Sequence, residues 1–230
     1  MLYSLRVAAP RLPFAAGQFV KIALDVTGER VARPFSLVNA PADPTLEFYG
    51  VIVPEGPLSP RLAELSPGDA LYLSPNPSGF LVMAEVPDTE TLWMIATGTG
   101  LAPFLSILRT ETPWRRFARV VLVHAVRRAA ELTYRELLGA LRQAHGDRFG
   151  LVSFVSREPA AGALAGRIPA AIDDGRLEAA AGTSLAPESS HVMLCGNPEM
   201  VRDATAALGR RGLRKHRRRA PGHISVENFW

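Results

Sequence analysis

The sequence predicts a two-domain α+β protein, in which a small antiparallel β-barrel is followed by an α/β domain built on a parallel sheet. Up to about residue 86, short apolar runs alternate with turns such as "PADP", "PEGP" and "SPGD", which is typical of a barrel or sandwich. Beyond that point, continuous apolar runs alternate with segments of helical periodicity, which indicates βαβ units. We therefore expect domains over residues 1–86 and 87–230.

In the first domain, the short apolar runs predict five strands. They cover residues 17–26, 33–38, 46–53, 70–74 and 79–83. One short helix interrupts them, because Ser59 suits an N-cap, Pro60 suits the first helical position, and "RLAEL" follows before a Pro-Gly stop.

In the second domain, four buried runs predict parallel strands, and each is followed by a helical pattern. The strands cover residues 91–96, 119–125, 150–156 and 191–196. The helices cover residues 101–109, 131–144, a segment beginning near 166, and 198–211.

The composition, 47% hydrophobic and 21% charged over 230 residues, is that of an ordinary globular protein. No apolar run could cross a bilayer and no signal-peptide pattern stands at the start, so we expect a cytoplasmic protein. The single cysteine, Cys195, excludes an internal disulfide and any four-cysteine metal or iron–sulfur site. No metal site is expected, and one-electron chemistry here would need an organic cofactor.

Positive charge gathers near the end of the chain, within a net charge of +4. The cluster comprises Arg210, Arg211, Arg214, Lys215, Arg217, Arg218 and Arg219. Such a patch suits an acidic partner or a phosphate chain. A solvated helix face and tail would explain it equally well.

Ligands of an open parallel sheet bind beyond the carboxyl ends of its strands. Four loops should meet there, at residues 97–100, 127–128, 156–157 and 195–198. The glycines at 98 and 100 would let backbone approach a diphosphate at a helix N-terminus. However, Pro103 replaces the last glycine of the dinucleotide fingerprint, so a plain strand-to-helix turn is the alternative.

Arginines indicate which dinucleotide would bind at this edge. No acid directly follows the second strand, where an NAD-type site binds the ribose, and Arg127 stands there instead. Its guanidinium, with those of Arg157 and Arg167, suits a phosphate dianion. Singly, each could be a surface residue; jointly, they predict NADPH over NADH.

A short stretch of the first domain, "RPFS", places several chemical groups together. By strand alternation Arg33 and Phe35 share one face, while Ser36 points to the other. The segment can thus present a cation, an aromatic surface and a hydroxyl.

With these motifs in order, the chain resembles the bacterial ferredoxin (or flavodoxin)–NADP reductases, flavoproteins of the plant-type reductase superfamily. The matching pieces are "RPFSLVNAP", "EFYGVIVPEGPLSPRL", "TLWMIATGTGLAPFLSIL", "VLVHAVR", "FVSRE", "GRIP", "HVMLCGNPEMV" and the tail "PGHISVENFW". The resemblance implies an FAD-binding barrel over residues 1–86 and a Rossmann-like NADP-binding domain over 87–230, whose C-terminal tail folds onto FAD.

For the flavin, the resemblance implies that Arg33 holds the diphosphate, Phe35 lies against the ring, and Ser36 hydrogen-bonds near N5. Pro34 belongs to the same segment, and Tyr49 packs along the cofactor. The family usually has tyrosine at position 35, and losing its hydroxyl costs about 0.5–1.5 kcal/mol. We therefore expect altered tuning of the flavin and retained binding.

Other FAD contacts implied by the resemblance lie further along the chain. They are Pro57, Leu58 and Ser59 at the diphosphate, Thr99 at the flavin, and Phe229 and Trp230 at the end, with an aromatic ring on the adenine. Family members also have a strand before "LYSLRVAAP". Either the true start lies upstream of Met1, or this form is shorter and leaves an unpaired barrel edge.

For NADP, the resemblance assigns the 2′-phosphate end to Arg127, Ser156, Arg157 and Arg167. The glycine loops would contribute Gly98, Gly100, Gly196 and Asn197. Cys195 would sit near the reactive carbon of the nicotinamide and Glu227 would be a nearby carboxylate, so that both join Ser36 as catalytic residues. A small buried apolar residue is the plainer interpretation of Cys195.

The implied activity is hydride exchange between flavin N5 and the nicotinamide, coupled to single-electron exchange with ferredoxin or flavodoxin. We expect a monomer whose Arg217, Arg218 and Arg219 steer that acidic partner. Two alternatives are the reductase component of a multicomponent oxygenase and a basic nucleic-acid-binding module. Oxygenase reductases often favour NADH and carry a fused iron–sulfur domain, but this chain has neither the cysteines for such a domain nor an acidic residue for the ribose. A nucleic-acid-binding module would leave the nucleotide motifs unexplained, and the sequence lacks an aromatic–basic platform. We therefore expect no nucleic-acid partner, and no membrane partner either.

Overall fold

The computed structural model describes residues 1–9 and 12–228, which form two compact units. One unit contains residues 1–82 and 102–110, and the other contains residues 83–101 and those from 111 onward.

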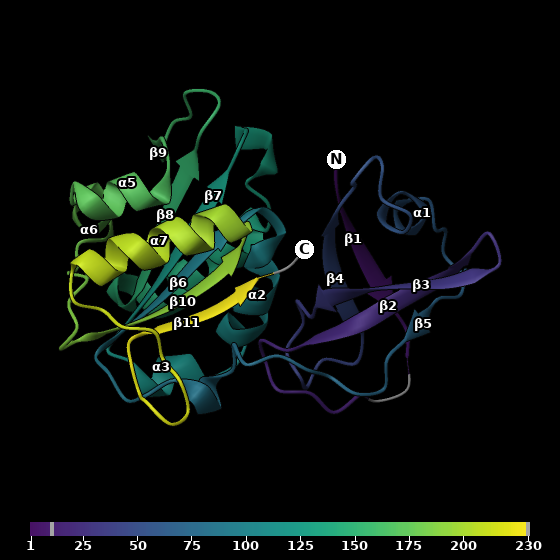
Figure 1. Cartoon of the computed structure of the whole chain (residues 1–230), viewed down its shortest axis with the longest axis horizontal. Helices are drawn as coiled ribbons and strands as arrows, with labels where there is room; N and C mark the ends of the chain where they lie inside the picture. The colour runs from purple at the N-terminus through teal and green to yellow at the C-terminus, as the bar shows by residue number, and fades with distance from the viewer. Residues whose placement is uncertain (10–11, 229–230) are drawn as a thin grey trace. The chain divides into compact units, whose positions relative to one another are not determined.

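Two small antiparallel sheets build the first unit, as expected (Figure 1). The first sheet pairs β1 (Leu2–Val7) with β4 (Leu46–Val51), and the second places β2 (Phe19–Val26) between β3 (Glu29–Ser36) and β5 (Tyr72–Leu73). A bridge from Leu37 to Phe48 links β3's continuation to β4. The core between them is apolar, and its buried members are Val20, Ile22, Leu37, Leu46, Phe48, Leu58 and Leu62.

Two strand predictions for this unit differ from the structure. Strand β1 was not among the predicted strands, and it pairs along its whole length with β4. The strand predicted at residues 79–83 is wrong: that segment forms no strand, and η1 (Met83–Glu85) begins at its end. Leu81 is buried there, and its carbonyl carbon would lie 3.0 Å from a Cβ on Gly17. The segment therefore packs closely against the backbone at Gly17 but does not pair with it as a strand.

The short helix α1 (Ser59–Ala63) forms where it was predicted, with Pro60 in its first turn. The predicted N-cap is wrong, because Leu58 occupies that position and provides no side-chain cap. The Ser59 hydroxyl instead accepts a hydrogen bond from the Val53 N–H at 2.9 Å.

Tyr3 lies opposite Gly50 in the β1–β4 pair and fills the space that a side chain there would need. A Cβ on Gly50 would come within 2.6 Å of the Tyr3 hydroxyl oxygen. That oxygen is buried without a hydrogen-bond partner among the described residues, and burial raises the pKa of Tyr3 to about 12.

We predict that Tyr3→Phe raises the free energy of unfolding by up to about 1 kcal/mol, because a buried polar group without a partner is removed. The sign with pH follows from the raised pKa. The unfolded chain ionises Tyr3 near pH 10 and the folded chain only near 12, so the wild type loses stability as pH rises through this window. Urea unfolding at pH 8 and pH 11 tests both effects; a variant less stable than the wild type at both values would contradict them.

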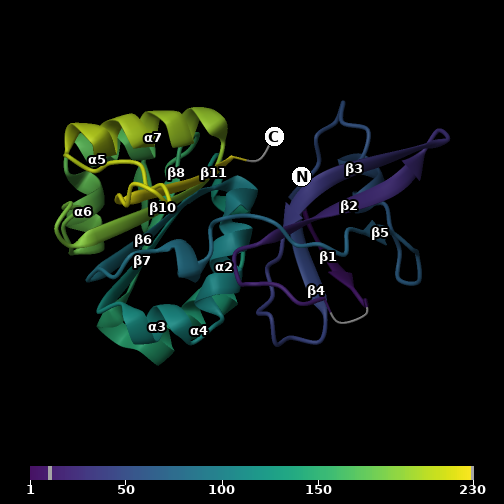
Figure 2. The ribbon, with the colours of Figure 1, turned by 60° about the horizontal axis from the view of Figure 1, so that its bottom comes forward.

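The second unit is a six-stranded, fully parallel sheet with helices on both faces, as expected. Its order is β11-β10-β6-β7-β8-β9. The strands are β6 (Thr91–Thr97), β7 (Arg119–Val126), β8 (Phe149–Val155), β9 (Ala163–Ala165), β10 (Ser190–Gly196) and β11 (Ile224–Asn228). In Figure 2, α5 (Ile168–Asp173) and α7 (Pro198–Arg210) lie on one face, with α3 (Thr112–Arg116) and α4 (Arg135–His145) on the other.

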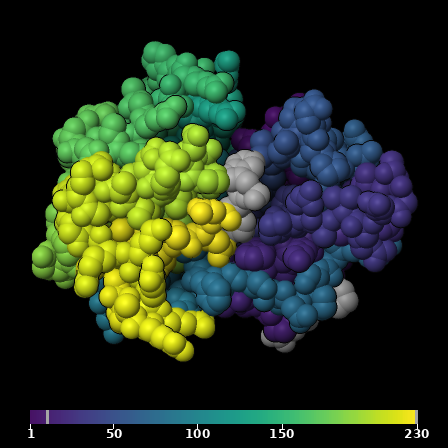
Figure 3. Space-filling view, in the orientation of Figure 1, coloured from purple at the N-terminus to yellow at the C-terminus, as the bar shows by residue number. Residues whose placement is uncertain are grey.

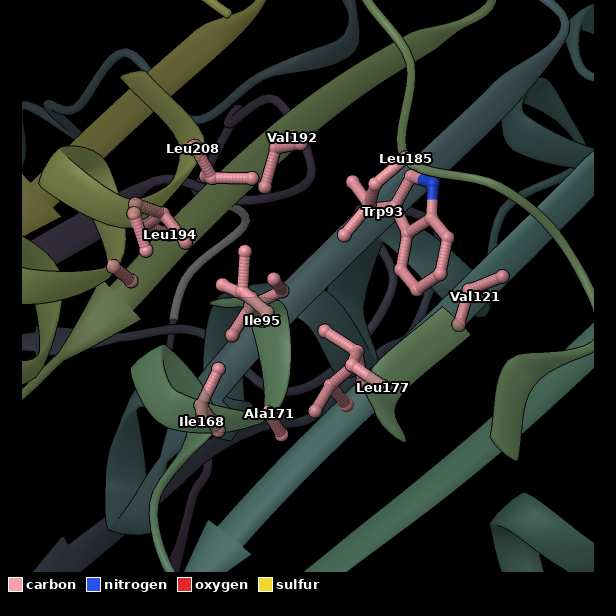
Figure 4. Close-up of a cluster of buried hydrophobic side chains, with 14 of the residues drawn as sticks. Trp93, Ile95, Val121, Ile168, Ala171, Leu177, Leu185, Val192, Leu194 and Leu208 are labelled. Atoms are coloured by element: carbon pink, nitrogen blue, oxygen red, sulfur yellow. The ribbon is translucent and has the colours of Figure 1, made fainter. Parts of the chain in front are cut away.

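An apolar core fills the space between the sheet and one helical layer. Figure 4 shows Trp93 and Ile95 of β6 beside side chains from β7, β10, α5 and α7, and from α6 (Arg176–Ala181). All residues of β6 but the last are buried, as are all of β10. Burial on both faces explains why these strands were visible as continuous apolar runs.

Several elements of this unit went unpredicted or begin elsewhere. The short elements α3, α6, β9 and β11 were not predicted. Helix α4 begins at Arg135 and not at residue 131, because Tyr134 has a left-handed φ of 55° and residues 129–131 form the 3-10 turn η3 (Ala129–Glu131).

Helix α2 (Ala102–Leu108) belongs to the first unit, which differs from a single division between residues 86 and 87. The Ser106 hydroxyl donates to the Asn39 carbonyl at 2.7 Å, and both groups are buried. Arg109 then pairs with Asp43 at 2.9 Å and with Glu47 at 3.7 Å. These contacts join residues that are far apart in the sequence.

Candidate functional site

The sheet of the second unit changes direction between β6 and β10. From β6 the chain proceeds through β7, β8 and β9 on one side, and then returns to β10 and β11 on the other. In such sheets a ligand binds at the carboxyl ends of the strands where the order reverses. The loops that leave β6 and β10 are therefore the site that the topology favours, and both carry predicted residues.

The two loops touch at their glycines. Residues 98–101 form the 3-10 turn η2 (Gly98–Leu101), with Thr99 half-buried between the two glycines. A Cβ on Gly100 would lie 2.6 Å from the Cys195 carbonyl oxygen and 2.7 Å from the Gly196 Cα. A Cβ on Gly196, whose φ is +127°, would lie 2.7 Å from the Thr97 carbonyl oxygen. Only glycine permits this close approach of the two backbones.

Hydrogen bonds hold the same two loops together. The Thr97 hydroxyl accepts from the Asn197 N–H at 2.8 Å. The Asn197 side-chain oxygen accepts from the N–H groups of Glu199 and Met200, which caps α7. This oxygen is therefore used within the protein, and the side chain positions the helix that follows the loop.

A buried histidine binds the glycine turn η2 through a backbone carbonyl. His124 of β7 lies 3.1 Å through Nε2 from the Gly98 carbonyl oxygen. A carbonyl only accepts, so Nε2 carries the hydrogen. Burial lowers the pKa of His124 to about 4, so the ring is neutral at physiological pH. This contact could not be predicted from the sequence, because a lone histidine in an apolar strand does not show that it binds the Gly98 carbonyl.

Cys195 and Glu227 come together as predicted neighbours, since they lie opposite each other in the β10–β11 pair. The Cys195 side chain is fully buried. Desolvation, and then the nearby Glu227 carboxylate, hold the pKa of the thiol well above its usual value. Cys195 is thus a neutral thiol and a poor nucleophile. It can serve as a small packing and positioning group, while Glu227 is half-buried beside it.

The predicted arginines lie on loops at the carboxyl edge of the same sheet. Arg127, Ser156, Arg157 and Arg167 are all exposed. The Arg157 N–H donates to the Arg127 carbonyl at 2.9 Å, which joins the loops after β7 and β8. Among the described residues, the guanidinium groups of Arg127, Arg157 and Arg167 have no ion-pair partner, whereas Arg128 pairs with Glu158 at 3.8 Å. The site arginines are therefore open to an anion.

The first unit carries its own group of predicted residues. In the β2–β3 pair, Arg33 stands opposite Ile22 and Phe35 opposite Val20, so the two share one face, as predicted. The Arg33 guanidinium is exposed and donates to its neighbour's carbonyl, that of Ala32, at 2.8 Å. Pro34 fits here because β3 is an edge strand, where a missing N–H is tolerated.

The remaining residues predicted in this unit lie on two further elements. Ser36, at the end of β3, and Tyr49, on β4, are both buried. Pro57 and Leu58 lead into α1, where the Arg61 guanidinium donates to the Pro57 carbonyl at 2.9 Å. Two hydrogen bonds thus hold the segment before α1, one from the Val53 N–H to the Ser59 hydroxyl and one from Arg61 to the Pro57 carbonyl. Leu58 is buried in the core.

Several members of the basic cluster form ion pairs within the protein, among them Arg210, Arg211 and Arg218. Arg218 donates to the Glu85 carboxylate through Nε and Nη2, at 2.6–3.1 Å. Arg217 and Arg219, on either side of it, are exposed. Figure 3 shows the yellow C-terminal segment at the surface. The predicted contacts of Phe229 and Trp230 lie outside the described residues.

Comparison with known proteins agrees with this arrangement. The family described as "Oxidoreductase NAD-binding domain" matches residues 94–206. The flavodoxin/ferredoxin–NADP reductases of Shigella flexneri and Escherichia coli K12 are 53% and 52% identical, over the whole of this chain and 93% of their own length. This chain belongs to the flavodoxin/ferredoxin–NADP reductase family. The resemblance noted in the sequence is thereby confirmed.

A solved structure extends the likeness to the fold. It is a ferredoxin NADP⁺ reductase from Neisseria gonorrhoeae with bound FAD and NADP, 36% identical, with a TM-score of 0.94 over 100% of this chain and 93% of that one. As a member of this family, the chain is an oxidoreductase.

No helix among its described residues is long and apolar enough to cross a membrane. These residues also include no metal-binding group of three or more histidine, cysteine, aspartate or glutamate side chains.

Proposed function

We propose that this chain carries electrons between NADP(H) and a ferredoxin or flavodoxin through bound FAD, with FAD on the first unit and NADP(H) on the second. The observation that carries the proposal is a group of exposed arginines, Arg127, Arg157 and Arg167, which have no ion-pair partner among the described residues. They follow strands of a parallel sheet whose two glycine loops meet where the strand order reverses. The 53% sequence identity to the Shigella flexneri reductase supports it, because the similarity extends over the whole chain and therefore over both units.

The residues of the first unit fit FAD. Arg33 offers an exposed guanidinium to a diphosphate, and Phe35, on the same face and half-buried against the core, offers an aromatic surface for a flat ring. Ser36, the last residue of β3, and Tyr49, on β4, carry the hydroxyl groups that the family resemblance assigns to FAD. When bound, FAD would supply the exchange between two-electron and one-electron chemistry.

The residues of the second unit would bind and orient NADP(H). Arg127, Ser156, Arg157 and Arg167 would hold the 2′-phosphate. The turn at Gly98, Thr99 and Gly100 and the loop at Gly196 and Asn197 would admit the dinucleotide backbone closely. Cys195, as a neutral buried thiol, would position the nicotinamide and exclude water, with Glu227 beside it.

A visible spectrum of the purified protein tests the proposal. We expect flavin absorbance that anaerobic NADPH bleaches faster than NADH at equal concentration. A colourless protein that FAD cannot reconstitute would overturn the FAD assignment, and equal bleaching by both nucleotides would overturn the NADP assignment.

For the protein partner, we propose that the exposed Arg217 and Arg219 attract an acidic ferredoxin or flavodoxin, while Arg218 serves the fold through Glu85. Charge reversal of Arg217 and Arg219 together should slow reduction of the partner roughly tenfold at low salt and less at high salt. Reduction of ferricyanide, a small acceptor, should be unchanged. An equal fall with both acceptors would argue against steering.

The remaining alternatives are separated by the same measurements. An oxygenase reductase component would prefer NADH in the bleaching experiment, and a nucleic-acid-binding module would shift labelled DNA without any flavin. The monomeric state and the cytoplasmic location remain predictions, and light scattering of the purified protein tests the first.

A further inference from the structure

The loop that carries Arg127 is held by an acidic residue that faces inward. The Glu131 carboxylate oxygen Oε2 accepts from the N–H of Arg127 and from the N–H of Arg128, each at 2.9 Å. Two hydrogen bonds from consecutive peptide groups to one oxygen fix the backbone at the point where the Arg127 side chain leaves it.

Further contacts brace the rest of this loop. The Glu158 carboxylate accepts from the Ala129 N–H at 2.8 Å. Arg135 donates to the carbonyls of Leu132 and Ala129, at 2.9 and 3.1 Å. Backbone N–H and C=O groups of the loop are thus bound by charged side chains along its length, and the Arg127 side chain is exposed.

We propose that Glu131 is a positioning residue for selection of the 2′-phosphate: it holds the Arg127 backbone so that the guanidinium meets the phosphate without first having to be ordered. This inference rests on the proposed function. Glu131 stands five residues after the end of β7, and its carboxylate turns back onto the backbone of the loop. An acidic residue in this position supports the loop that carries the phosphate-binding arginine.

The negative charge of Glu131 would by itself repel a phosphate nearby, whereas its hydrogen bonds to the backbone would favour phosphate binding. The two effects have opposite signs, so two variants can separate them. Glu131→Gln keeps an oxygen that can accept both N–H bonds and removes the charge. Glu131→Ala removes the acceptor and the charge together. If Glu131 acts by holding the backbone, glutamine preserves selection and alanine loses it.

The experiment measures binding of 2′-phospho-AMP and of 5′-AMP to the FAD-loaded protein by calorimetry. We expect Glu131→Ala to weaken 2′-phospho-AMP about tenfold and 5′-AMP less than about twofold, because loosening a preorganised site costs most for the group it holds. Glu131→Gln should bind both ligands as the wild type does, or 2′-phospho-AMP more tightly. Glu136→Ala, at an exposed position on α4, is the matched control and should bind as the wild type.

Amide hydrogen exchange at Arg127 and Arg128 provides a second measurement that does not depend on ligand. Exchange should be faster in Glu131→Ala and unchanged in Glu131→Gln. Equal weakening of both ligands by alanine, or a glutamine variant as weak as the alanine variant, would overturn the inference. A wild type that does not distinguish the two ligands would instead overturn the NADP assignment.

Discussion

Arg127→Ala and Arg157→Ala should each raise the KM for NADPH by roughly 10- to 100-fold while leaving the KM for NADH within about twofold. A hydrogen bond to a charged group contributes about 1.5–3 kcal/mol, and each 1.4 kcal/mol is tenfold in affinity. Both guanidinium groups are exposed and lack an ion-pair partner among the described residues, so no internal ion pair is lost on truncation. Under the proposed assignment, the cost therefore falls on binding of the 2′-phosphate.

Steady-state kinetics with both nucleotides check this, and the chain offers a matched control. Arg128 is adjacent to Arg127 and equally exposed, but it pairs with Glu158 at 3.8 Å. Arg128→Ala should leave both KM values near those of the wild type. Replacing Arg127 by lysine keeps the charge but loses the planar fork, so an intermediate KM is expected. Equal increases for NADPH and NADH would show that these arginines do not read the phosphate.

The central strands of the second unit could be predicted from the sequence because of one physical property. Strands β6, β7 and β10 are buried on both faces, so their whole length is apolar and stands out from its surroundings. The carboxyl ends of such strands must meet at one edge, which is why the loops carrying Gly98, Arg127 and Gly196 could be assigned to one sheet edge before the structure was known.

What sequence analysis missed depends on contacts between distant segments or on elements too short to show a period. Strand β9 has three residues and β11 five, and both are edge strands. The Arg218–Glu85 pair joins positions 133 residues apart, so charge counting placed Arg218 with its neighbours in the docking patch. The contacts of the Glu131 carboxylate likewise depend on the folded loop, so they could not be predicted from the sequence.

Gly196→Ala should reduce the rate of flavin reduction by NADPH by about 100-fold or more. The added Cβ would stand 2.7 Å from the Thr97 carbonyl oxygen and closer still to its hydroxyl, and the φ of +127° is one that alanine rarely adopts. The loops after β6 and β10 must therefore separate, which displaces Cys195, and misplacement by about 1 Å can cost two orders of magnitude in rate. Stopped-flow absorbance at the flavin band measures the rate.

Gly100→Ala tests the same contact from the opposite loop, since its Cβ would lie 2.6 Å from the Cys195 carbonyl oxygen. Gly139→Ala is the control: it lies within α4 with nothing within 4 Å of the added Cβ, and it should stabilise the helix by about 1 kcal/mol without changing the rate. Circular dichroism separates a local effect from unfolding. If Gly196→Ala and Gly100→Ala both folded and their flavin was reduced at the wild-type rate, the contact between the two glycine loops would not position the nicotinamide for hydride transfer. A site that depended on this contact could not keep its rate once the two loops had been pushed apart.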